Sequence, residues 1–200
     1  MIGGRKRLIL WIALAVPAAA MLYDLSSGRV LAMDLLHPSG EMAVRLMILA
    51  MLPGPLSAFF GLNRLFRAWL AIRRNLGVAA FAYAMLHLAF YCADMRISSA
   101  ILDELTLPAI WTGWLALGLL AIPAAISFDR AVRLLRRRWK HIQTLVYAAL
   151  GLSLIRWLLL DWSVGPVLLH VTPLFAAWLL RGLSRFRSRP LVTPKKRIFS

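Results

Sequence analysis

The sequence predicts an all-α integral membrane protein, a bundle of about six transmembrane helices with both termini in the cytoplasm. Hydrophobic residues make up 61% of its 200 residues, and the mean hydropathy is +0.73. A soluble domain, whose apolar share is about half, could not bury that excess. The apolar residues form long continuous runs, and inside lipid only a helix satisfies the backbone of such a run. The third observation is a one-sided distribution of charge.

Six apolar runs are long enough to cross a bilayer. We expect helices over residues 7–25, 42–62, 75–95, 107–127, 142–160 and 164–181. Each is close to the roughly 20 residues that cross about 30 Å of hydrocarbon. The connections are short, so residues 1–184 form one transmembrane domain and residues 185–200 a basic, flexible cytoplasmic tail. The first run is expected to remain as a span because five further runs follow it.

The basic residues lie on one side of this predicted bundle. All but four of the 24 Lys and Arg residues fall at the N-terminus, between the second and third runs, between the fourth and fifth, or after the sixth. Of the acidic residues, only Asp129 is on that side. An excess of Lys and Arg marks cytoplasmic loops, which predicts a multi-pass protein of the bacterial inner membrane with both termini inside. The net charge of +16 thus indicates topology and contact with anionic membrane lipid, not nucleic acid.

Glycine and proline interrupt the runs. Gly40, Gly61 and Gly165–Pro166 are expected at helix ends or turns. The triplet Pro53-Gly54-Pro55 should bend or break the second helix, and it is the predicted position of a widened internal cavity.

Several kinds of chemistry are excluded by what the sequence lacks. Cys92 is the only cysteine, which excludes an intrachain disulfide, an iron–sulfur cluster and a thiolate zinc site. No serine–histidine–acid grouping, paired carboxylates in a span or phosphate-binding glycine loop is present, which argues against hydrolysis. His37 is expected in the outer loop, and His141, solvated, in the basic inner loop.

Three ionisable residues fall inside the predicted spans, where such groups are costly and indicate function. His87 lies about 10 Å below the outer end of the third helix, either as an axial ligand of b-type haem or as a histidine bonded to a neighbouring helix. His170, on the sixth helix, lies at a similar depth, so the two could ligate one iron; chance placement is the alternative. Arg156, on the fifth helix, either pairs with Asp161 or holds an anion such as a haem propionate.

Six short segments, in order, resemble the ferric-reductase-like transmembrane family over about residues 40–180. They are Ser39-Gly40-Glu41-Met42-Ala43-Val44-Arg45, Gly54-Pro55-Leu56, Arg73-Arg74-Asn75-Leu76-Gly77, Leu86-His87-Leu88 with Tyr91, Trp139, and Leu145-Val146-Tyr147. The branch they resemble is the haem-binding membrane subunit of bacterial periplasmic methionine sulfoxide reductase systems. The resemblance implies a bundle that carries b-type haem and passes electrons outward from a quinone or a cytoplasmic flavin reductase. In that branch the acceptor is a periplasmic molybdenum oxidoreductase.

The fifth predicted helix departs from the family pattern. His87 matches the family's histidine on the third helix. Gln143 stands where the family has a histidine two residues before Leu-Val-Tyr, and Arg156 where it has a second one thirteen residues later. His141 is two positions from Gln143, about 200° around a helix, so it cannot simply substitute.

These departures leave two interpretations. In the leading one, a b-type haem is retained on His87 with a partner outside the family pattern, such as His170, and Arg156 contacts a propionate. The protein is then an electron-transfer subunit rather than a complete enzyme. In the other, the haem site is lost and the bundle is a haem-free scaffold for a partner or a quinone-binding subunit, since a fold can outlast a function.

Overall fold

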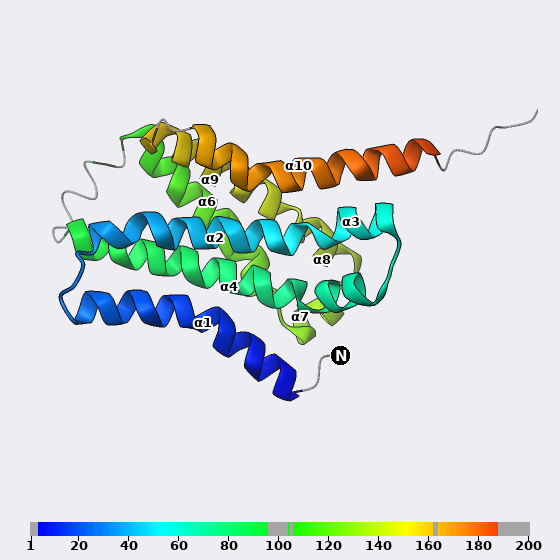
Figure 1. Ribbon diagram of the computed structural model, residues 1–200, viewed down its shortest axis with the longest axis horizontal. Coiled ribbons are helices and arrows are strands. Elements are labelled where there is room, and N and C mark those ends of the chain that lie inside the picture. Colours follow the sequence, from blue (N-terminus) through cyan, green and yellow to red (C-terminus); the bar gives the residue numbers. More distant parts are fainter. Residues whose placement is uncertain (1–3, 96–103, 105, 162–163, 188–200) are drawn as a thin grey trace, which may run out of the picture.

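The computed structural model describes residues 4–95, 104, 106–161 and 164–187. Within them the regular elements are all helical, and they run along one long bundle (Figure 1). In chain order they are α1 (Gly4–Ser26), the 3-10 helix η1 (Met33–Leu35), α2 (Leu36–Met51), α3 (Pro53–Phe60), α4 (Arg64–Met95), α6 (Pro108–Ala125), α7 (Asp129–Leu135), α8 (Arg137–Gln143), α9 (Leu145–Asp161) and α10 (Val164–Arg187).

Six helical segments of the described chain are long and apolar enough to cross a membrane, which confirms the predicted number. The second consists of η1, α2 and α3 together, and the fifth of α8 and α9. The start of α1 and the end of α10 lie at the same end of the bundle (Figure 1). The orientation of the bundle, with this end facing the cytoplasm, stays a prediction from the distribution of Lys and Arg.

Two helices begin six or more residues before their predicted starts. The second begins at Leu36, so Gly40 lies inside a helix and its assignment to a helix end was wrong. The third begins at Arg64, eleven residues before the expected start at position 75. Asn63 explains that start, because its side-chain oxygen accepts a hydrogen bond from the Phe66 backbone N–H at 2.9 Å. Gly61 ends α3 with a φ of 79°, which confirms the predicted turn.

The proline triplet interrupts the second span as predicted. α2 ends at Met51 and α3 begins at Pro53. The chain nevertheless continues in the same direction, because the Leu52 N–H donates to the Ile48 carbonyl at 3.0 Å. Pro53 and Pro55 are buried, and neither lines the two cavities described below.

The core lies where α2, α4, α9 and α10 meet. Ala80, Ala149 and Ala177 are each 0% exposed there, beside Leu174 at 1%. Small side chains allow close approach of helices, which is how transmembrane helices associate when lipid is as apolar as their surfaces. α2 packs mainly on α4, and α6 on α9, so these two pairs enclose the space in which the candidate site lies.

α1 is attached to the side of the bundle and has no buried residue. The Tyr83 hydroxyl of α4 joins it, accepting from the Ala18 N–H at 3.0 Å and donating to the Leu14 carbonyl at 2.8 Å. Pro17 has no backbone N–H, so one hydrogen bond of α1 is missing at this point. The Tyr83 hydroxyl inserts next to that gap in the hydrogen bonding of the helix.

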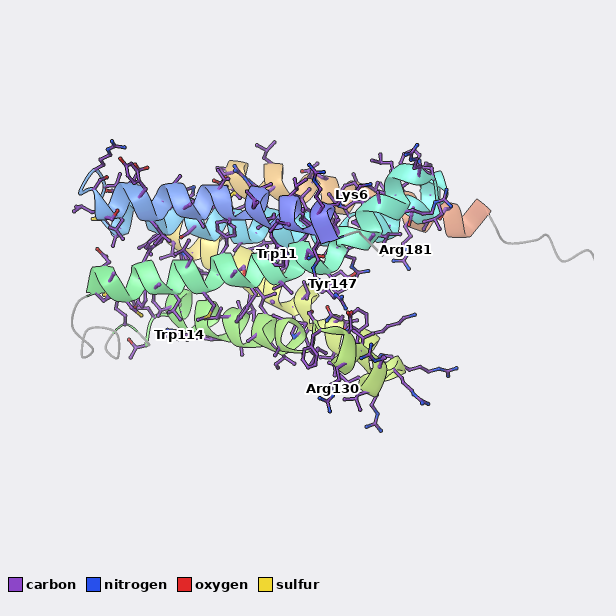
Figure 2. All side chains as sticks on the ribbon, turned by 90° about the horizontal axis from the view of Figure 1, so that it is seen from below. Lys6, Trp11, Trp114, Arg130, Tyr147 and Arg181 are labelled. Carbon is purple, nitrogen blue, oxygen red and sulfur yellow. The ribbon has the colours of Figure 1, made fainter. Side chains whose placement is uncertain are left out.

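Basic side chains gather at one end of the bundle, as Lys6, Arg130 and Arg181 show in Figure 2. The connection between α6 and α9 holds the short helices α7 and α8, so His141 is exposed as predicted but lies in a helix rather than a loop. Asp129 of α7 pairs with Arg74 of α4 at 2.6 Å. That hydrogen bond lowers the pKa of the Asp129 carboxyl below its ordinary value of 3.8.

Candidate functional site

Two cavities lie one above the other along the bundle. The larger, about 340 Å³, lies between α2, α4, α6 and α9, and its polar lining residues include His87, Arg156 and Glu41. We call it the acidic-end cavity. The smaller, about 190 Å³, is lined by Arg73, Arg74 and Gln143 among others and is called the basic-end cavity. The larger volume is at the lower end of the range of small-molecule sites, and the smaller volume is below that range.

His87 projects from α4 into the wall of the acidic-end cavity. Its Nδ1 is 2.8 Å from the Leu36 carbonyl oxygen, which can only accept, so Nδ1 carries the proton. The Ser39 hydroxyl lies 3.2 Å from the same nitrogen and donates to the Leu35 carbonyl at 2.6 Å. This fixes the tautomer and leaves the Nε2 lone pair free to accept. Histidines that bind metals are oriented by a partner on the other ring nitrogen in the same way.

The segment Ser39-Gly40 of α2 forms the seat for this ring. A Cβ added at Gly40 would lie 3.2 Å from Nδ1 and 3.3 Å from Cε1 of His87, so glycine allows the close approach of the two helices. This segment is part of the family resemblance, but no role was predicted for it. Its role is visible only once α2 and α4 are packed together.

Arg156 of α9 faces His87 from the opposite wall. Its Nη1 donates to His87 Nε2 at 2.7 Å, and its Nε donates to the Ala109 carbonyl of α6 at 3.2 Å. A Cβ at Gly113 would lie 2.7 Å from Arg156 Cδ, so that glycine leaves the passage for the side chain. The predicted pairing with Asp161 concerns a side chain outside the described residues. The structure therefore brings two of the three predicted site residues into direct contact.

Further polar groups lie around the cavity. The Tyr91 hydroxyl donates to Glu104 Oε2 at 2.8 Å. His37 was expected in a loop, but it lies in the first turn of α2, lines the cavity, and has its ring 5.5 Å from that of Trp157. The error follows from the helix boundary, since the Gly40 that was read as a helix end is helical.

His170 belongs to a neighbouring cluster. Its Nδ1 donates to the Pro166 carbonyl at 2.7 Å, and its Nε2 accepts from Arg45 Nε at 3.0 Å. Arg45 also pairs with Glu41 at 2.6 Å. The His170 ring is 5.3 Å from that of Trp157, which lines the acidic-end cavity. Both nitrogens of His170 thus have partners, and the structure does not bring its ring to Nε2 of His87.

The basic-end cavity contains the second departure from the family pattern. Gln143 Nε2 donates to the Pro123 carbonyl at 3.1 Å and lies 3.5 Å from the Ser127 hydroxyl. The Pro123 carbonyl also accepts from the Ser127 hydroxyl at 2.6 Å, so Gln143 adds a second donor near the end of α6. The residues that line this cavity include no histidine.

The group that faces His87 Nε2 across the cavity offers iron no second ligand. An iron between two ligand atoms would separate them by about 4 Å, twice a metal–nitrogen bond of about 2.0 Å. The atom opposite His87 Nε2 is a guanidinium nitrogen at 2.7 Å, which has no lone pair to give. No cluster of three or more His, Cys, Asp or Glu that could hold a metal occurs among the residues that the structure describes. Arg156 therefore supplies no ligand opposite His87, although a second histidine, His37, also lines the cavity.

Comparison with known proteins agrees with this arrangement. The family described as ferric reductase like transmembrane component matches residues 39–154. Proteins from Brucella ovis, Brucella canis and Brucella melitensis are each 32% identical to this chain. The similarity covers 96% of this chain and 90% of each of theirs. Each of these relatives is named as the protein-methionine-sulfoxide reductase heme-binding subunit MsrQ.

The matched region runs from the serine beside His87 to the turn of α9 that precedes Arg156. It therefore includes the seat of His87 and most of the cavity wall. From the family match and the near full-length similarity, the chain belongs to the ferric-reductase-like transmembrane family.

Proposed function

We propose that this chain is a membrane electron-transfer subunit that passes electrons across the bacterial inner membrane to a methionine-sulfoxide-reductase-type partner in the periplasm. The observation that supports this most is His87, which lines the acidic-end cavity with Nδ1 held by the Leu36 carbonyl. Its Nε2, which accepts from Arg156 in this structure, carries the lone pair that an iron would need. The similarity to haem-binding subunits over nearly the whole chain supports the same conclusion.

We infer that a b-type haem would be held in this cavity through one protein ligand. His87 Nε2 would hold the iron, and Arg156 would be available to a propionate or another anion on the same wall. When bound, the haem supplies one-electron redox chemistry in the apolar part of the bundle. Because Nε2 has a single lone pair, it serves either Arg156 or iron, so the contact between His87 and Arg156 belongs to the haem-free protein.

The proposed direction of transfer combines the predicted topology with the donor and acceptor that the family resemblance implies. The basic end, with Arg73, Arg74 and the short helices α7 and α8, is the predicted cytoplasmic side and the side of a quinone or flavin donor. The acidic-end cavity then opens toward the periplasmic acceptor, a molybdenum oxidoreductase by resemblance. An electron path across the bundle requires a carrier between these ends.

The test is an oxidised-minus-dithionite-reduced absorbance spectrum of the protein purified after expression with haem supplied, with haem quantified as its pyridine complex. We expect a haem band in the wild type and in His141→Ala, whose histidine is exposed in α8. We expect its loss in His87→Ala. His170→Ala should retain it, because both nitrogens of that ring have other partners. Haem that persists in His87→Ala would contradict the assignment.

A second candidate function is a haem-free subunit that docks a partner or binds a quinone. It is favoured by one observation, the direct contact of Arg156 with the nitrogen that iron would need. It predicts a colourless protein even when haem is supplied, and a quinone recovered in an organic extract if the cavity binds one. The spectrum of the wild type separates the two candidates.

A further inference from the structure

We propose that Arg156 occupies the place facing His87 Nε2 in the acidic-end cavity, so that His87 has no histidine opposite it, and that Arg156→His would supply that second histidine. This inference rests on the proposed function, because it concerns the same haem site. It can be tested separately, because its main measurement is the haem that Arg156→His gains.

The positions of the two side chains support it first. His87 comes from α4 and Arg156 from α9, on opposite walls of one cavity. Their contact of 2.7 Å joins Nη1, near the tip of a long side chain, to Nε2, the atom through which an imidazole binds iron. A histidine at position 156 has a shorter side chain, so its ring would stop short of that contact and leave space between the two rings.

The surroundings hold Arg156 in this place. Its Nε donates to the Ala109 carbonyl at 3.2 Å, and the missing Cβ of Gly113 provides the passage for Cδ. His87 is seated independently, by Leu36 and Gly40 of α2. One neighbouring helix therefore fixes each side chain, α6 for Arg156 and α2 for His87. The contact between them does not depend on a flexible surface side chain.

The chemistry of arginine also supports the proposal. A guanidinium remains protonated in proteins and has no acceptor lone pair, so it cannot be an axial ligand. It can only donate to His87 or contact an anion. Iron held by His87 with Arg156 across the cavity keeps one coordination position without a protein ligand, which favours a high-spin state over the low-spin state of two-histidine haem.

The experiment compares wild type, Arg156→His and Arg156→Gln, each purified in detergent after expression with haem supplied. Gln is the matched control because it removes the charge without adding an imidazole. Haem per chain is measured as the pyridine complex, and spin state by electron paramagnetic resonance. We expect Arg156→His to hold about one low-spin haem per chain, and the wild type and Arg156→Gln to hold none in the low-spin, two-imidazole form.

Poor folding of Arg156→His is covered by a second variant. Arg156→Gly leaves the cavity open to free imidazole added with haem, which should convert the iron to the low-spin form in a concentration-dependent way. Adding His87→Ala to that variant should lose bound haem altogether, because the remaining protein ligand is gone.

The outcomes separate this inference from the proposed function. High-spin haem in the wild type and low-spin haem in Arg156→His support both. A colourless wild type with low-spin haem in Arg156→His supports the inference and removes haem from the proposed function. Low-spin two-imidazole haem in the wild type overturns the inference while the proposed function stands. Absence of low-spin haem in both Arg156→His and imidazole-supplied Arg156→Gly also overturns it.

Discussion

The two cavities differ in what remains around the positions where the family has a histidine. At the acidic end, Arg156 faces His87, so one ligand and a charged donor remain together. At the basic end, Gln143 bonds to the Pro123 carbonyl of α6, and the cavity lining includes no histidine. Positions 143 and 156 are thirteen residues apart, about 20 Å along a helix. Redox function is therefore expected at the acidic end, whereas Gln143 has a structural role at the other.

The largest expected effect separates the cavities directly. Gln143→His restores the residue type of the family at the basic end, but no histidine among the lining residues faces it. We expect no gain of low-spin haem in this variant, in contrast to about one per chain in Arg156→His. Haem quantification and electron paramagnetic resonance on the two purified variants measure the contrast. A gain in Gln143→His would show that the basic end still contains a ligand.

The next effect tests how tightly the acidic-end pair is built. Gly113→Ala places a Cβ 2.7 Å from Arg156 Cδ, so the side chain has to shift and its contact with His87 is strained or lost. We expect a loss of about 1–3 kcal/mol, seen as a lower melting temperature in detergent. Gly118→Ala in the same helix is the control, since its Cβ meets nothing within 4 Å. That control should be neutral or stabilised by about 0.5–1 kcal/mol. Equal melting of the two variants would contradict this account of the passage.

A smaller effect compares one glycine from each cavity. A Cβ at Gly40 lies 3.2 Å from His87 Nδ1, whereas a Cβ at Gly77, which lines the basic-end cavity, meets nothing within 4 Å. Gly40→Ala should lower the melting temperature and the haem content together, because it turns the His87 ring. Gly77→Ala should lower neither the melting temperature nor the haem content. Thermal melting and haem quantification are measured on both variants. Equal losses in Gly40→Ala and Gly77→Ala would contradict the distinction between the two cavities.

The smallest effect belongs to the basic end. Arg74 lowers the pKa of Asp129, so the pair stabilises the fold above the ordinary carboxyl value of 3.8 and loses that contribution as pH falls through the lowered pKa. Asp129→Asn should therefore melt slightly below the wild type at pH 7, with the difference shrinking as the pH drops under 3.8. High salt should also reduce it, because the carboxylate is exposed. A difference that grows toward low pH would contradict the assigned sign.

The fold was predictable because each of its determinants acts along the chain. Apolar runs give the number of spans, and Gly61 and Pro53 mark interruptions that the structure contains. The early start of α4 could have been inferred from Asn63, whose side chain caps the helix. The early start of α2 was missed because Gly40 was read as a helix end, whereas its missing Cβ allows the His87 ring to approach the helix closely.

The depth of the site residues in the membrane was predictable, but the side of each helix from which they project was not. Position along a span indicated that His87 and Arg156 lie toward one end of the bundle. It did not show around which side of each helix they project, and that angle decides which residues meet. The contact between α4 and α9 and the seat of His87 in α2 join residues more than 40 positions apart, so no local spacing contains them.

The most direct test of the account is the spin state of iron in the wild-type protein purified after expression with haem supplied, measured by electron paramagnetic resonance with His87→Ala alongside. We expect about one high-spin haem per chain, held by His87 and absent from the variant. A low-spin, two-imidazole signal would show that a second histidine ligates the iron. No haem in the wild type would show that the bundle works without it, and the contact of Arg156 with His87 would then be its working state.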